Sequence, residues 1–344
     1  MKWITTIWIF TAILLTVIVN DGCKKNNAFV PTPMPLQVPN GFPSPTGVFA
    51  ENPPTKEGFE LGRRLFYDGQ LAQDGQTSCA SCHQQFAAFA TFDHDLSHGV
   101  NNQFTTRNSP TLFNLAWQNF FHWDGGINHL EVQPLAPITA PNEMGETIEN
   151  VINKLKQDAR YRTMFKAAFG SDEINSQRML KAIAQFVGSM VSANSKYDQM
   201  KRGAAVFTQA EQNGYQVFLA KCNSCHREPL FTDHSFRNIG LPMNGLKDLG
   251  RMAITGKRED SLKFKVPTLR NIMVSFPFMH DGRFVGFDQV FNHYSRGAVP
   301  SPTLDPLLRA GIPLNNNERN ALLAFFQTLT DQEFMQNPLF SAPR

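Results

Sequence analysis

The sequence predicts a mainly α-helical fold of two similar domains, residues 54–200 and 201–344, extended by long loops. First, few segments alternate apolar and polar residues as half-buried strands do. Second, Gly62–Phe66 and Gly214–Phe218 each place an apolar pair three and four residues beyond a glycine, on one face of a helix. Third, 344 residues with 42% hydrophobic side chains are enough for two domains of ordinary size.

Three longer helices are expected outside this repeat. Helical patterns run over residues 144–169 and 177–201, and each is followed by a glycine of the kind that ends helices, Gly170 and Gly203. A third helix is expected over residues 317–329, with Asn317 as its N-terminal cap and an apolar stripe behind it.

The strongest chemical signal is the motif Cys-x-x-Cys-His, which occurs at residues 79–83 and 222–226. Two thiols at this spacing can add to the vinyl groups of one haem, and the histidine that follows can ligate its iron. The sequence therefore predicts two covalent c-type haems, one in each domain. The attaching thiols would be those of Cys79, Cys82, Cys222 and Cys225, and the iron ligands would be His83 and His226.

Other uses of paired cysteines fit this sequence less well. A four-thiolate zinc site usually has 15–20 residues between its pairs and needs no histidine after both. A thioredoxin-like redox motif would lie near a βαβ pattern, which is not visible here. Disulfides form outside the cytosol, but a bridge between cysteines three apart would close a very small loop.

The N-terminus has the form of a secretory signal peptide over residues 1–23, with a charged start and an apolar run from Ile4 to Val19. This run is short for a membrane-spanning helix. Gly22-Cys23 would suit lipoprotein cleavage, although Asn20 and Asp21 are poor matches, so a plain signal peptide or an uncleaved anchor stays an alternative. We expect export to the periplasm or cell envelope, with membrane contact only through a lipid on Cys23.

Residues 24–53 are rich in proline and are expected to form an extended tether between this N-terminus and the folded domains. The formal net charge of +3 is nearly balanced. A nucleic-acid partner is therefore not expected.

Six further blocks lie between and after the haem motifs. They are residues 107–114 (Arg-Asn-Ser-Pro-Thr-Leu-Phe-Asn), 122–125 (His-Trp-Asp-Gly), 130–133 (Leu-Glu-Val-Gln), 143–145 (Glu-Met-Gly), 264–271 (Phe-Lys-Val-Pro-Thr-Leu-Arg-Asn) and 277–282 (Pro-Phe-Met-His-Asp-Gly). In these blocks the chain resembles the bacterial di-haem cytochrome c peroxidase family, including its MauG-type branch. The resemblance covers about residues 57–330 and implies two cytochrome c-like domains, each with one covalent haem, related by duplication.

The resemblance implies that the N-terminal haem reacts with peroxide and that Gln133 and Glu143 line its distal pocket. A carboxylate there could move a proton between the two peroxide oxygens. The alternative for Glu143 is an acid at the N-terminus of the 144–169 helix, where the helix dipole favours negative charge. Trp123 matches the family's tryptophan between the haems and would shorten the electron path. It could equally be a core tryptophan that donates its N–H to a carbonyl.

A calcium ion between the domains is also implied by the resemblance. Asn108, with the carbonyls of Ser275 and Pro277, matches the positions that hold it. Such oxygens suit a hard cation, and water would complete the coordination sphere.

The distal ligand of the second haem separates the branches of the family. Tyr294, seventeen residues after Pro277, stands where classical members have Met and the MauG-type branch has Tyr. A phenolate would stabilise ferric iron and lower the potential, whereas Met raises it. Met279 and His293 are rival ligands.

The first haem has its own open question. His98 lies nine residues before Arg107, where the family spacing for a loop histidine that closes the oxidised iron would be seven. His98, or else His94, could ligate this iron, but a solvated loop residue and a five-coordinate iron are the favoured interpretation. Ala220 replaces the Trp by which the MauG-type enzyme oxidises its protein substrate, which puts that activity in doubt.

The function expected from these features is reduction of hydrogen peroxide to water with electrons from a small cytochrome c or cupredoxin. One alternative is a MauG-like oxidase of a protein or organic substrate, and another is a non-enzymatic di-haem electron carrier. Gln133 and Glu143 disfavour the electron carrier, because a protein that only transfers electrons needs no acid in a distal pocket. The oligomeric state stays open, with a homodimer among the alternatives.

Overall fold

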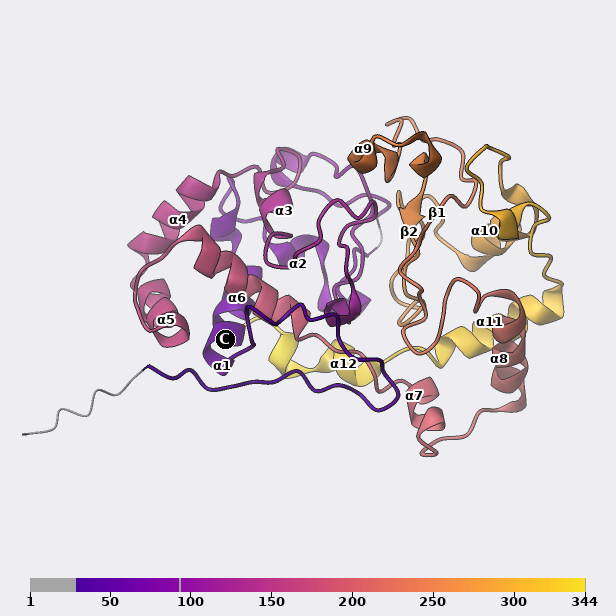
Figure 1. The fold of residues 1–344 in the computed structure, drawn as a ribbon, viewed down its shortest axis with the longest axis horizontal. Helices are drawn as coiled ribbons and strands as arrows, with labels where there is room; N and C mark the ends of the chain where they lie inside the picture. The colour runs from indigo at the N-terminus through magenta and orange to yellow at the C-terminus, as the bar shows by residue number, and fades with distance from the viewer. Residues whose placement is uncertain (1–28, 93, 344) are drawn as a thin grey trace, which may run out of the picture. The chain divides into compact units, whose positions relative to one another are not determined.

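The computed structural model describes residues 29–92 and 94–343, and from Pro31 onward the chain forms one compact unit. The described part is mainly helical, as predicted (Figure 1). Its α-helices are α1 (Lys56–Phe66), α2 (Cys79–Cys82), α3 (Leu135–Thr139), α4 (Ile148–Gln157), α5 (Ala159–Phe169), α6 (Ser176–Gly188), α7 (Lys196–Lys201), α8 (Gln209–Lys221), α9 (Met252–Thr255), α10 (Phe287–Asn292), α11 (Asn316–Gln327) and α12 (Gln332–Gln336). Two short strands, β1 (Phe236–Arg237) and β2 (Phe264–Lys265), pair antiparallel.

The first core forms where α1 packs on α6. Thr55 caps α1 by accepting from the N–H of Gly58, and the helix buries Phe59, Leu65 and their apolar neighbours. A glycine permits the close approach, because a Cβ on Gly62 would lie 1.9 Å from the carbonyl oxygen of Ala182.

The second core repeats this contact between α8 and α11, which lie side by side in Figure 1. A Cβ on Gly214 would lie 1.9 Å from the carbonyl oxygen of Ala321 and 2.8 Å from the Cβ of Phe325. In the first core the matching distance, from Gly62 to the Cβ of Phe186, is 2.9 Å. Both helix pairs therefore cross at a glycine set against an alanine and a phenylalanine.

The predicted 144–169 helix is wrong at its start and in its middle. The chain first becomes α-helical at Ile148, after Thr147 caps α4. Asp158 then ends α4 and caps α5, because its side chain accepts from the N–H of Arg160. Only the C-terminal end at Gly170, with a left-handed φ of 77°, is as predicted.

The other two helix predictions need smaller corrections. The 177–201 stretch is two helices, because α6 ends at Gly188 and Ser195 caps α7 in a capping box. The last long helix is capped by Asn315 and not by Asn317. In the first stretch the helical pattern continues past the capping Ser195, whereas before the last helix three consecutive asparagines, residues 315–317, offer similar caps.

The described part of the expected tether lies on the folded unit. The N–H of Met34 donates to the carbonyl of Pro54 at 2.9 Å, and the indole of Trp117 donates to that of Pro43 at 2.8 Å. Asn52 is buried and hydrogen-bonds Gln185 of α6. Residues 32–54 are therefore not a free spacer.

The signal peptide and Cys23 fall within residues 1–28, outside the described residues. Among the helices of the described part, none is long and apolar enough to cross a membrane.

The end of the chain returns to the first core, although it falls within the predicted 201–344 domain. Phe334, Met335 and Phe340 pack in that core with residues of α1 and α6. The hydroxyl of Tyr67 donates to the carbonyl of Phe340 at 2.6 Å, which fixes this return.

Candidate functional site

The first Cys-x-x-Cys-His motif forms one helical turn, α2, with His83 directly after it. The His83 Nδ1 lies 2.9 Å from the carbonyl oxygen of Phe89. Because a carbonyl can only accept, Nδ1 carries the proton and Nε2 keeps its lone pair for a metal. Burial lowers the pKa of His83 to about 4, so the ring is neutral, as an iron ligand must be.

The second motif supports its histidine in the same way. The His226 Nδ1 lies 3.1 Å from the carbonyl oxygen of Pro267 and 3.3 Å from that of Phe231, and burial lowers its pKa. Phe231 has a φ of 55°, and Phe89 in the first motif has a φ of 58°. Two residues that rarely adopt this conformation thus present their carbonyls to the two histidines.

The thiols of both motifs form no disulfide, and burial raises the pKa of Cys79 to about 12 and of Cys82 to about 11. Nowhere in residues 29–92 and 94–343 do three or more His, Cys, Asp or Glu side chains gather as a metal site. Each motif therefore offers two free thiols and one oriented imidazole, which is the donor set that a covalent haem requires.

The structure brings Glu143 to the first motif. Its carbonyl accepts from the N–H of Val100 at 2.7 Å, and two residues before Val100 the carbonyl of His98 lies 3.9 Å from the Cys82 Sγ. The Glu143 carboxylate is also among the causes, after burial, that raise the pKa of Cys79 and Cys82. Burial also raises the pKa of Glu143 itself. It lies in the turn after α3 and not at a helix N-terminus, because α4 begins only at Ile148. The helix-dipole alternative is therefore wrong.

Gln133 contacts His122, a residue for which no role was expected from the sequence. Its Nε2 is 3.3 Å from the Nε2 of His122, whose imidazole is close enough to His83 to affect its pKa. His122 also has a left-handed φ of 64°. In the sequence, the only indication of a role for His122 is its position next to Trp123. A single histidine has no spacing pattern that would identify it as a site residue.

Trp123 joins the two halves of the chain. Its indole N–H donates to the carbonyl of Asn108 at 2.8 Å, and its own carbonyl accepts from the N–H of Lys265 at 2.7 Å. Trp123 therefore has the bonded N–H of a core tryptophan and links Asn108 of the first half to Lys265 of the second.

Asn108 and Pro277, two of the expected calcium ligands, are in contact. The Asn108 Nδ2 donates to the carbonyl of Pro277 at 2.6 Å, and Ser275 lies two residues earlier on the same loop. Within the described residues, the Asn108 Oδ1 is buried and has no hydrogen-bond partner. A buried oxygen beside a backbone carbonyl fits a hard cation such as calcium.

Tyr294 lies in a turn of π-helix, His293–Gly297, that follows α10. Burial, followed by the thiols of Cys225 and Cys222, raises the pKa of its phenol. His293 is engaged elsewhere, because its Nε2 lies 2.9 Å from the carbonyl oxygen of Ile239.

His98 lies beside the first motif through its backbone, whose carbonyl is 3.9 Å from the Cys82 Sγ. Its imidazole is engaged with other groups. Nδ1 is 2.5 Å from the Asn102 Oδ1, and the ring packs 4.4 Å from that of Phe104 and 5.1 Å from that of His94.

Residues 56–206 match the family described as di-haem cytochrome c peroxidase. The methylamine utilization protein MauG of Methylophilus methylotrophus is 33% identical over 92% of this chain and 94% of its own length. The chain belongs to the di-haem cytochrome c peroxidase family. Cytochrome c551 peroxidase of Nitrosomonas europaea is also 33% identical, over 84% of this chain and 85% of its own.

A solved structure agrees with this assignment. A MauG-like protein associated with microbial copper homeostasis superposes with a TM-score of 0.80 and 32% identity, covering 93% of this chain and 99% of its own. As a di-haem cytochrome c peroxidase, the protein is an oxidoreductase with two c-type haems. Family members are in general periplasmic c-type cytochromes. The two oriented histidines and four free thiols fit these groups.

Proposed function

We propose that the protein reduces hydrogen peroxide to water in the pocket of Cys79, Cys82 and His83. The observation that carries the proposal is the half-buried carboxylate of Glu143, which is among the causes that raise the pKa of these two thiols. An electron carrier has no need of such an acid, whereas peroxide cleavage needs a group that moves a proton.

The side chains of the pocket divide this work. The Glu143 carboxylate takes a proton from one peroxide oxygen and returns it to the oxygen that leaves as water. Gln133 offers its amide to the bound peroxide, and His122 holds that amide in place through the contact at 3.3 Å. The haem, when bound, supplies the iron at which the electrons reach the peroxide.

Electrons would enter at the second haem and reach the first by way of Trp123. We assign Tyr294 as the distal ligand of the second haem, because its phenol faces Cys222 and Cys225 while His293 is bonded to Ile239. At the first haem we assign no sixth protein ligand, because the His98 ring packs on the exposed ring of Phe104 in its own loop and lies nine residues, not seven, before Arg107.

Further assignments complete the proposal. Calcium binds at Asn108 and the carbonyls of Ser275 and Pro277. The electron donor is a small cytochrome c or cupredoxin. The exported chain is anchored by a lipid on Cys23 if that site is processed. The halves arose by duplication, which is supported by the matched helix crossings and the matched histidine supports. A homodimer is the oligomeric state to test first.

A second candidate function is oxidation of a protein or organic substrate, as in the MauG-type branch. Tyr294 favours it, because a phenolate ligand suits a low-potential haem. Ala220 disfavours it, because no indole is available at this position of α8.

The test is steady-state peroxide consumption by the holoprotein with a reduced c-type cytochrome, before and after reduction by one electron. The proposal predicts turnover in both states, because no protein ligand must leave the first iron. Turnover only after reduction would assign a gating ligand to the first haem. Absence of turnover in both states would favour the oxidase or the carrier.

A further inference from the structure

Two segments of the chain have the same local structure: residues 107–127, the first segment, and residues 264–284, the second segment. Positions four to six of each segment are Pro-Thr-Leu, at residues 110–112 and 267–269. Positions eighteen and nineteen are Asp-Gly, at residues 124–125 and 281–282. Position fifteen of each segment is a phenylalanine whose N–H donates to the carbonyl of position twenty-one. Phe121 donates to Ile127, and Phe278 donates to Phe284, both at 2.7 Å. Equivalent positions in the two segments can therefore be compared directly.

The two segments contact each other in exchanged roles. The N–H of Asn108 donates to the carbonyl of His280 at 2.8 Å, and the N–H of Lys265 donates to the carbonyl of Trp123 at 2.7 Å. Asn108 and Lys265 are each the second residue of their segment, and Trp123 and His280 are each the seventeenth. Each segment thus donates from its second position to the seventeenth position of the other, as an approximate twofold symmetry between the segments requires.

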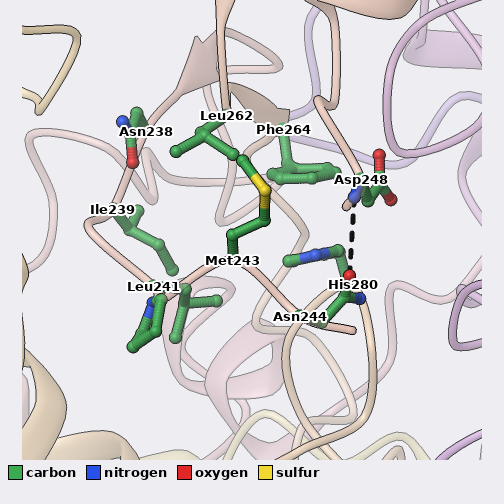
Figure 2. Close-up of a pocket in the computed structure, with 10 residues that line it drawn as sticks. Asn238, Ile239, Leu241, Met243, Asn244, Asp248, Leu262, Phe264 and His280 are labelled. Atoms are coloured by element: carbon green, nitrogen blue, oxygen red, sulfur yellow. Dashed lines mark hydrogen bonds between the residues drawn. The ribbon is translucent and has the colours of Figure 1, made fainter. Parts of the chain in front are cut away.

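The first residues of the segments meet where this exchange occurs. The guanidinium of Arg107 lies over the ring of Phe264 at 5.6 Å. Phe264 in turn stacks on His280 with ring centroids 3.7 Å apart, as Figure 2 shows. Arg107 is also fixed by ion pairs to Asp124 and Asp248.

The exchange extends to the side chains of the second residues. The Asn108 amide lies 2.6 Å from the carbonyl of Pro277, the fourteenth residue of the second segment. The Lys265 Nζ donates at 2.9 Å to the carbonyl of Phe120, the fourteenth residue of the first segment. It also donates at 2.6 Å to the Oε1 of Gln118, whose position is equivalent to that of Ser275.

We propose that the Lys265 ammonium is a built-in cation that occupies the counterpart of the calcium site. The inference rests on the proposed calcium site at Asn108, Ser275 and Pro277. In the first segment, the backbone carbonyl at position fourteen and the side-chain oxygen at position twelve both accept from the Lys265 ammonium, while the backbone carbonyl of Gln118 accepts from Thr46. The molecule thus has two related cation sites between its halves, and the one that Lys265 fills cannot be emptied by a chelator.

The ammonium of Lys265 is held by two acceptor oxygens and by the charge of Asp124. Burial acts against it and lowers the pKa of the side chain to about 7, so the site holds a cation below about pH 7. Its bonds to Phe120 and to the carbonyl of Trp123 lie on both sides of His122. Lys265 therefore fixes the loop that carries the peroxide-pocket histidine and the tryptophan.

The test is calcium titration by calorimetry on holoprotein stripped with chelator. Lys265→Asn restores at position 265 the amide that Asn108 has, so this variant should bind one calcium ion more than the wild type. Lys265→Met supplies no oxygen and should bind the same number as the wild type. Lys263→Asn is the matched control, because Lys263 lies two residues before Lys265 and pairs with Asp260 instead. This variant should also bind the wild-type number of calcium ions.

A second readout is thermal unfolding with and without calcium. Calcium should restore the Tm of Lys265→Asn but not that of Lys265→Met. If Lys265→Asn does not yield folded holoprotein, Lys265→Gln is titrated in its place. A folded amide variant with the wild-type stoichiometry would overturn the inference. If the wild type binds no calcium while the amide variant binds one, the Asn108 site fails, Lys265 still fills a cation site, and its equivalence to a calcium site is overturned.

Discussion

At the residue scale, the chemistry of this protein depends on which polar side chains are buried beside the two haem motifs. The histidines of both motifs are oriented by backbone carbonyls, and burial lowers the pKa of each. The spacing of Cys-x-x-Cys-His follows from covalent chemistry, so the sequence alone supports the prediction that these histidines ligate iron. His122 was not predicted, because its neighbours in the pocket are brought to it by the fold.

The pH dependence of peroxide turnover follows from Glu143. Burial raises its pKa above the ordinary value of 4.5, so it is protonated at a higher pH than an exposed glutamate. A protonated carboxyl cannot accept the peroxide proton, and kcat/KM should therefore fall as the pH decreases through this raised pKa. The pH profile of kcat/KM measures this directly. An acid limb at or below pH 4.5 would contradict the assignment.

Ligation of the second iron is tested by its potential. If Tyr294 is the ligand, the ferric protein lacks the sulfur-to-iron absorption of a His/Met haem, and Tyr294→Met raises the potential because a neutral thioether favours ferric iron less. Redox titration and absorption spectra measure both. Should Met279 be the ligand, Tyr294→Phe would leave the spectrum unchanged and Met279→Leu would alter it.

At the element scale, the helices end where polar caps intervene in an otherwise continuous apolar pattern. Asp158 and Ser195 each accept from a backbone N–H at the start of a new helix, and these local bonds divide both long helices predicted from periodicity. Periodicity identified the helical stretches correctly, because the buried faces continue across the breaks. It does not reveal which polar residue acts as a cap.

The two helix crossings give a prediction about stability. Gly62→Ala and Gly214→Ala each place a Cβ 1.9 Å from a backbone carbonyl oxygen, so the helices must separate. Each change should cost about 1–3 kcal/mol of the free energy of unfolding, as overpacking usually does. Chemical denaturation measures the cost. Gly245→Ala is the control, because nothing lies within 4 Å of its Cβ position. Equal stability of all three variants would contradict the crossing geometry.

At the scale of the whole molecule, the two halves are joined by contacts that local sequence patterns do not reveal. Phe334 and Phe340 return to the first core from the end of the chain. The bonds exchanged by Asn108 and Lys265 link segments more than a hundred residues apart. Family resemblance identified both segments, but their contacts depend on tertiary packing.

The two-haem organisation should be visible in the purified protein. We expect two covalent haems per chain, and His83→Ala and His226→Ala should each change the spectrum of one haem and leave the other intact. Haem content by absorption and metal content by elemental analysis test this. A single haem, or zinc in place of iron, would contradict the organisation.

The central claim is that Glu143 moves the proton during peroxide cleavage, and one comparison tests it most directly. Steady-state peroxide reduction by the wild type and by Glu143→Gln is measured with the same reduced cytochrome, after both haems are shown to be bound. The account predicts a rate lower by about 10²- to 10⁴-fold, the usual loss for a positioned acid–base group. Unchanged turnover with both haems in place would contradict it.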